Sequence, residues 1–485
     1  MHRSAPRVAK NTLAQLVARG LEGATNFTVT VLLARVLGAS SLGAFALLTT
    51  YAGLFVFLGT FGLNLLMARE VARHREQARR YLANALGMGL VLAAITVALQ
   101  IGIIRLVSDD PLVRKGVYLA AAFTVLQSCE LLFVGVFYAL ERMELETICI
   151  FVEKAVLLVA VFALVLTGGG VMQVLGVFVG AAASVLLLYL ALAARLVGFP
   201  RPAADFALWR RLAAESWPFS LNLLLTSIYF QTHVVLVALL ASQRAAGYFR
   251  AGSVVALGLP IIAMGLNTAL LPLMARAHPQ RPQAFEFGLE RAFRVLMLVG
   301  LPLAAGLIAL AQPLMVGFYG PRFAPAILVF QLLGASVPIK FAANTVAAAL
   351  TAADRQPQRT LAVGIGAAVC VALAFALIPR FHHNGAAVAA VMTDLVILAT
   401  TYYYLRRAGY RLDMLSLAVR PAVAAAVMGV SLWWLRGMSL AVTVPAGIAI
   451  YAAAAVAMGA VRRADGEWLW QALASRQASL EVGPP

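Results

Sequence analysis

Residues 81–107 read YLANALGMGLVLAAITVALQIGIIRLV, a run of 27 residues in which the one charged side chain is that of Arg105. A helix needs ~20 mostly apolar residues to cross the hydrocarbon core of a bilayer. This run satisfies that requirement with residues to spare. We therefore expect residues 81–107 to form a membrane-spanning helix.

The same pattern recurs along the whole chain, with short connections between the apolar runs. The longest polar stretches, about 198–213 and 276–287, are too short to fold into a separate domain. The sequence thus predicts an all-α integral membrane protein with about fourteen transmembrane helices. The predicted helices cover roughly 12–36, 42–68, 81–107, 116–140, 147–167, 171–197, 214–241, 245–275, 288–318, 324–352, 359–379, 384–405, 412–435 and 439–461.

The composition agrees with a membrane protein. Of the 485 residues, 62% are hydrophobic and 12% are charged, whereas an ordinary soluble domain is about half apolar and about a quarter charged. The net charge of +18 lies in short clusters between apolar runs, which favours membrane anchoring over a nucleic-acid partner. The three cysteines have no CxxC or Cys/His spacing, so we expect no disulfide, metal site or other cofactor.

The distribution of positive charge predicts the orientation. An even number of helices places both termini on one side of the membrane. If that side is the cytoplasm, 25 of the 38 Lys and Arg residues lie in cytoplasmic segments and 8 in external ones. The positive-inside rule then predicts a bacterial inner-membrane protein with both termini cytoplasmic and a cytoplasmic tail at 462–485.

Two stretches about 204 residues apart resemble each other. Leu37-Gly38-Ala39-Ser40-Ser41-Leu42-Gly43-Ala44-Phe45 is echoed after Leu240, so that Gly43 aligns with Gly247 and Phe45 with Phe249. A repeat of this length contains six helices, and an even number gives both copies the same orientation.

The repeat predicts two parallel six-helix lobes, residues 1–200 and 201–410, followed by two further helices at 411–461. Parallel-repeat transporters carry substrate between two such lobes by alternating access. We expect the same mechanism here.

These stretches resemble a known family. The segments LLARVLGASSLGAFALLTTYAGLF (32–55), FGLNLLMAREVAR (61–73) and HNGAAVAAVMTDLVILATTYYYLRR (383–407) are similar to the oligosaccharide flippases, the Wzx-like polysaccharide exporters of the MATE-related MOP superfamily. The resemblance covers roughly residues 10–410. It implies transfer of a polyprenyl-diphosphate-linked oligosaccharide from the cytoplasmic to the periplasmic leaflet, for a cell-surface polysaccharide such as O-antigen, lipopolysaccharide or exopolysaccharide. It also implies a polysaccharide polymerase and glycosyltransferases as partners.

One position departs from the family pattern. The seventh helix of such flippases often carries an acidic residue near its middle, whereas here the neighbourhood is Tyr229-Phe230-Gln231-Thr232-His233. Ion coupling at this place would lack its carboxylate.

Three cations within predicted helices are candidates for binding the diphosphate: Arg19, Arg250 and Lys340. A charge at the bilayer centre costs about 2.5–3.5 kcal/mol on insertion scales, so such residues usually face a cavity or a partner. Arg binds phosphate through two parallel hydrogen bonds. The alternatives are a structural ion pair of Arg19 with Glu22, three residues on, and a snorkelling Lys340.

The other candidates are polar groups that could take part in coupling or line the cavity. Glu22, Glu130 and Asp394 are acids within predicted helices. Glu22 could instead pair with Arg19 on the same helix, whereas Glu130 and Asp394 could instead pair across helices. Because the ordinary pKa of histidine lies near neutral pH, His233 could link transport to protons, but an interhelical hydrogen bond is the commoner role for such a residue.

Other classes of protein share this hydropathy. A peptidoglycan-precursor flippase would use a similar cationic cavity, whereas a MATE-type antiporter would need an acidic one. A membrane glycan polymerase or ligase usually has a large external loop that carries catalytic residues. The external loops here are short and lack a DxD or nucleophile–base constellation, so we expect a transporter and not an enzyme.

Overall fold

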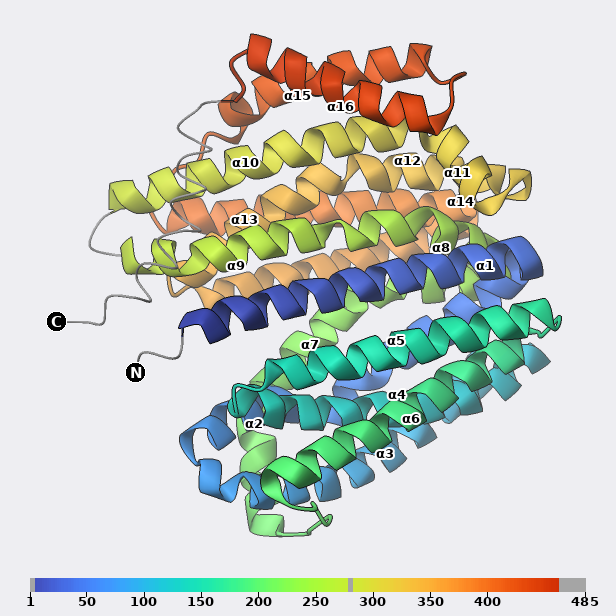
Figure 1. The fold of residues 1–485 in the computed structure, drawn as a ribbon, viewed down its shortest axis with the longest axis vertical. Coiled ribbons are helices and arrows are strands. Elements are labelled where there is room, and N and C mark those ends of the chain that lie inside the picture. The colour runs from blue at the N-terminus through green and yellow to red at the C-terminus, as the bar shows by residue number, and fades with distance from the viewer. Residues whose placement is uncertain (1–4, 278–281, 462–485) are drawn as a thin grey trace. The chain divides into compact units, whose positions relative to one another are not determined.

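The computed structural model describes residues 5–277 and 282–461, and the regular elements in these two ranges are helices (Figure 1). Packing divides the chain into two compact units. The first comprises Lys10–Arg250, and the second comprises the residues from Ala251 onward with the start of α1. The division of the lobes near residue 200 rests on the repeat and stays a prediction, and the predicted tail at 462–485 lies outside the described residues.

The first unit begins with a long helix and ends inside α8. Gly62, whose φ of 73° is accessible to glycine at little cost, turns the chain between α1 and α2. Asp110 caps α4 by accepting hydrogen bonds from the N–H groups of Leu112 and Val113. The helices of this unit are α1 (Ala5–Thr60), α2 (Leu63–Arg73), the 3-10 turn η1 (Arg75–Gln77), α3 (Ala78–Val107), α4 (Pro111–Ala139), α5 (Met143–Leu166), α6 (Val171–Val197), α7 (Phe206–Leu240) and the first part of α8 (Gln243–Gly258).

The first unit has an apolar core and an apolar exterior. In the core, the ring of Phe137 in α4 stacks on Tyr189 in α6, with centroids 5.8 Å apart. On the outside of α3, however, Leu90 and Ile95 are exposed. Large exposed aliphatic side chains along a helix are unfavourable in water and favourable in contact with lipid.

The two repeat glycines lie against each other in this unit. A Cβ atom added to Gly43 would lie 1.6 Å from the carbonyl oxygen of Gln243, and one added to Gly247 would lie 1.9 Å from the carbonyl oxygen of Ala39. The backbones of α1 and α8 therefore approach so closely that only glycine fits at either position. The contact is reciprocal, as expected where equivalent parts of two repeats meet around a pseudo-twofold axis.

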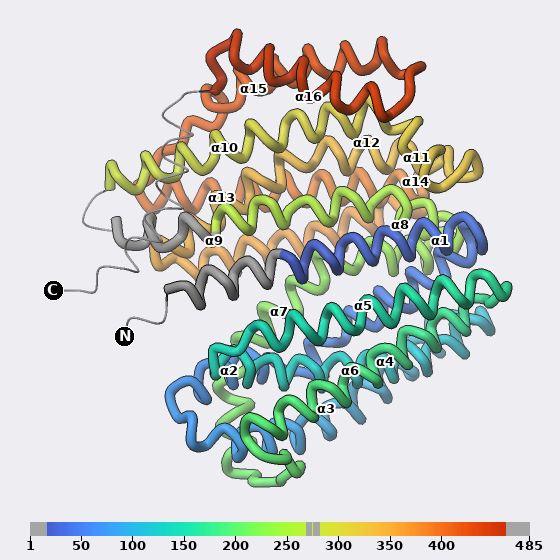
Figure 2. Tube along the Cα trace, in the orientation of Figure 1, coloured from blue at the N-terminus to red at the C-terminus, as the bar shows by residue number. Residues whose placement is uncertain are grey.

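In the second unit several helices begin at proline, whose missing N–H is not needed in the first turn of a helix. Helices α15 and α16 lie beside α10 (Figure 2), where the Tyr451 hydroxyl donates to the carbonyl of Leu298 at 2.8 Å. The elements of the second unit are α9 (Pro260–Ala277), α10 (Pro282–Ala309), α11 (Ala311–Tyr319), the 3-10 segment η2 (Pro321–Ala326), α12 (Ile327–Ala335), α13 (Val337–Ala352), α14 (Gln356–Arg407), α15 (Met414–Trp434) and α16 (Leu440–Ala457).

Within the described ranges, 12 helical segments are long and apolar enough to cross a membrane. Two of them, Val17–Arg73 and Gln356–Arg407, have 57 and 52 residues. At 1.5 Å per residue a helix of that length extends about 80 Å, well over twice the ~30 Å of a hydrocarbon core. The backbone leaves the helical conformation inside the first at Gly38 and again at Phe61–Gly62, and inside the second at His382. Each long segment therefore corresponds to two of the fourteen predicted helices.

Candidate functional site

Arg19 and Glu22 form an ion pair on one face of α1. The Nη1 atom of Arg19 lies 3.0 Å from Oε2 of Glu22, and the side chains of Arg19 and Glu22 are 58% and 28% exposed. The predicted pairing is therefore present. More than half of the Arg19 side chain nevertheless remains accessible, so the pair leaves N–H donors for another ligand.

Lys340 and Asp394, which the sequence treated as separate candidates, form a buried ion pair. The Nζ atom of Lys340 in α13 lies 2.6 Å from Oδ2 and 2.8 Å from Oδ1 of Asp394 in α14. The two side chains are 8% and 1% exposed. In this arrangement each charge neutralises the other, and the pair joins two helices of the second unit.

Glu130 is a buried acid in α4. It is 9% exposed, and within the described chain its Oε1 atom has no hydrogen-bond partner. In α5, Glu153 and Lys154 pair with each other at 2.6 Å although they are adjacent in sequence.

His233 and Arg250 lie near the end of the first unit. His233 is buried in α7, and its ring centroid is 6.1 Å from that of Phe249 in α8. Arg250 is half-buried in α8, one residue further along the chain. The roles of His233 and Arg250 in binding and coupling stay predictions.

A charge network that the sequence did not predict joins α2 to α7. Glu70, which is buried, lies within 3.6 Å of arginines on both helices, Arg69 and Arg211. Glu215 contacts the same two arginines, at 3.0 Å from Arg69 and 2.7 Å from Arg211. The clue in the sequence was the cluster of charges at the predicted cytoplasmic ends of these helices.

The segment before α7 is fixed by a second set of polar contacts. Arg80 donates to the Asp205 carboxylate at 2.9 Å, the Leu208 N–H donates to it at 3.1 Å, and the side-chain oxygen of Asn84 accepts from the Asp205 N–H at 2.9 Å. The hydrogen bond from Arg80, and to a smaller extent the one from the Leu208 N–H, holds the pKa of Asp205 below its ordinary value, because both stabilise the carboxylate.

Solved structures of known proteins share this fold. The lipid II flippase MurJ, in an inward closed conformation, matches with a TM-score of 0.75 at 12% identity, over 92% of this chain and 98% of that one. An inward-facing multidrug resistance MATE family transporter matches with a TM-score of 0.65 at 14% identity, over 81% of this chain and 95% of that one. A MOP superfamily transporter from Pyrococcus furiosus matches with a TM-score of 0.59 at 14% identity, over 84% and 97% of the two chains. The chain has the fold of the membrane transporters of this superfamily.

The family follows from the sequence itself. A family model described as polysaccharide biosynthesis protein matches residues 8–278, which is more than half of the chain. The chain therefore belongs to the polysaccharide biosynthesis protein family, and the predicted MATE-like fold is confirmed. A search of curated proteins finds no match.

Proposed function

We propose that this protein flips a polyprenyl-diphosphate-linked oligosaccharide from the cytoplasmic to the periplasmic leaflet of a bacterial inner membrane, for synthesis of a cell-surface polysaccharide. The observation that carries the proposal is the match to a polysaccharide biosynthesis family in a chain that has a flippase-like transporter fold. The positive-inside distribution of Lys and Arg supports cytoplasmic termini. The glycosyltransferases that build the glycan and the polymerase that consumes it are the partners of such a step.

The chemistry of the substrate explains the need for cations. The diphosphate carries the negative charge, while the polyprenyl tail remains in lipid and the sugars remain in water. Arg19 suits this task because its side chain is more than half exposed in a membrane-spanning segment and its guanidinium matches the geometry of phosphate oxygens. We assign diphosphate binding to Arg19 and Arg250.

A part for Lys340 in substrate binding depends on the state of its ion pair with Asp394. Its ammonium is already held by Asp394, so a part in substrate binding requires the pair to open or to share the cation. An exchange of this kind would link substrate binding to movement of α13 against α14.

The function is tested by reconstitution in proteoliposomes with a labelled polyprenyl-diphosphate oligosaccharide, whose side of the bilayer is determined by an external glycan-cleaving enzyme. Accelerated transfer relative to empty liposomes is expected. A polyprenyl monophosphate carrying the same glycan serves as the control, and equal rates for both lipids would contradict recognition of the diphosphate.

A second candidate is a peptidoglycan-precursor flippase, favoured by the likeness to the lipid II flippase. Replacing the oligosaccharide with lipid II in the same vesicles separates the two proposals. An antiporter of cationic drugs, suggested by the likeness to MATE transporters, would instead move a cationic dye and leave both glycolipids in place.

A further inference from the structure

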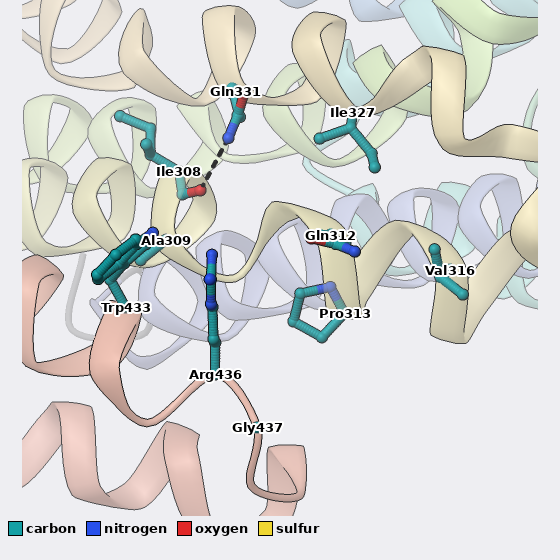
Figure 3. Close-up of a pocket in the computed structure, with 10 residues that line it drawn as sticks. All are labelled: Ile308, Ala309, Gln312, Pro313, Val316, Ile327, Gln331, Trp433, Arg436 and Gly437. Atoms are coloured by element: carbon teal, nitrogen blue, oxygen red, sulfur yellow. Dashed lines mark hydrogen bonds between the residues drawn. The ribbon is translucent and has the colours of Figure 1, made fainter.

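A pocket of about 570 Å³ opens in the second unit, where α10 meets α11 and where α15 ends (Figure 3). Its polar side chains are Gln312 from α11, Gln331 from α12 and Arg436 from the turn between α15 and α16. The remaining wall is apolar and includes Pro313 and Trp433. None of these residues belongs to the candidate site described above.

Arg436 is placed to meet a ligand. Its guanidinium carbon lies 4.5 Å from the centroid of the Trp433 ring, and its side chain extends into the pocket between Trp433 and Gln312 (Figure 3). In the part of the chain that the structure describes, no carboxylate forms an ion pair with Arg436. Gln331 is oriented by a 3.2 Å hydrogen bond from its Nε2 atom to the Ile308 carbonyl. The pocket therefore presents a cation and two carboxamides.

Aromatic side chains mark the depth of this pocket. Trp433 and Trp434 end α15, and their side chains are 52% and 77% exposed. Tryptophan is enriched at the level of lipid headgroups, because its ring is apolar and its N–H is polar. Arg436 follows two residues later and thus lies where lipid phosphates lie.

An apolar groove of about 390 Å³ lies between α10 and the pair α15–α16. Leu310, Leu314 and Leu432 line this groove. Each of them is next in the sequence to a residue that lines the polar pocket. A cationic pocket at headgroup level beside a groove for a hydrocarbon chain matches the two ends of a phospholipid.

We propose that this pocket binds an anionic phospholipid, with Arg436 holding the phosphate and one acyl chain in the groove. The charge selects the headgroup. An ethanolamine or choline cation would be repelled by Arg436, and the face of Trp433 that would attract such a cation is already covered by the guanidinium. This lipid is bound as a resident molecule and is not the transported substrate, so the proposal stands apart from the proposed function.

The test is native mass spectrometry of the full-length protein, released from nanodiscs that contain equal amounts of phosphatidylglycerol and phosphatidylcholine with identical chains. The wild type should retain phosphatidylglycerol in preference. Arg436→Gln should lower that preference by about tenfold or more, because the neutral amide no longer favours a headgroup of net negative charge over the zwitterionic choline headgroup. Arg436→Lys should restore part of it, since the charge remains and the planar fork is lost.

Arg380→Gln is the matched control, because Arg380 is also exposed at a predicted external end of the second unit but does not line the pocket. It should keep the wild-type preference. Equal losses in Arg436→Gln and Arg380→Gln would show a diffuse charge effect and overturn the proposal. Displacement of phosphatidylglycerol by excess inorganic phosphate would overturn it as well, because the pocket would then be a simple anion site.

Discussion

The buried pair of Lys340 and Asp394 gives the sharpest prediction. The two charged atoms are 2.6 Å apart and almost fully removed from solvent. Lys340→Met removes the cation and leaves a buried carboxylate, while Asp394→Asn leaves a buried ammonium. In each single variant a charge would lose its partner inside the protein.

The expected magnitude follows from that burial. Breaking a buried ion pair by removal of one partner costs about 3–5 kcal/mol, whereas replacing both partners by neutral groups is often close to neutral. Each single variant should therefore lower the free energy of unfolding by several kcal/mol. The double variant Lys340→Met/Asp394→Asn should recover most of this loss, because no unpaired charge remains.

The measurement is thermal and denaturant unfolding of the four purified proteins in one detergent. Lys115→Met is the matched control, since Lys115 is exposed and its replacement should change stability by no more than about 0.5 kcal/mol. If the losses of the two single variants add in the double variant, the residues are not coupled and the reasoning is refuted.

The same variants separate the two roles of Lys340. A double variant that is stable and still flips substrate would assign Lys340 a structural role. A double variant that is stable but inactive would support its predicted part in binding or coupling.

Two other predictions concern the first unit. Gly247→Ala should destabilise the protein by about 1–3 kcal/mol in denaturant unfolding, because the added methyl group collides with the Ala39 carbonyl. The control Gly258→Ala, at a position where an added Cβ meets nothing within 4 Å, should not; equal losses would contradict the close approach of α1 and α8. The charge of Asp205 stabilises the folded state fully above the unfolded pKa of about 4, and this contribution disappears as the pH falls through the lower folded pKa. Asp205→Asn should therefore be less stable than the wild type at neutral pH, and the two stabilities should converge as the pH falls through the lower folded pKa of Asp205. A constant difference across a pH titration of unfolding would argue against the role assigned to Arg80.

The sequence predicted the membrane helices well because crossing a bilayer imposes a local requirement on consecutive residues. It also separated 12–36 from 42–68 and 359–379 from 384–405, where the structure has breaks at Gly38 and His382. The single predicted helix 245–275 is instead divided into α8 and α9, because Pro260 begins a new helix.

The pairing of charges was predicted only where it is local. Arg19 and Glu22 are three residues apart, so helix geometry alone brings them together. Lys340 and Asp394 are separated by 54 residues, and nothing in their sequence neighbourhoods distinguishes this pairing from others. The contact of Glu70 with Arg211 depends in the same way on how α2 packs against α7.

The most direct test of the proposed function is the rate of leaflet-to-leaflet transfer of a labelled polyprenyl-diphosphate oligosaccharide in proteoliposomes. The wild-type protein should accelerate transfer, and Arg19→Ala and Arg250→Ala should abolish it in folded protein, while an Arg35→Ala control should retain it. Transfer no faster than in empty liposomes for several glycans would contradict the flippase proposal, and wild-type rates in both variants would contradict the cationic site.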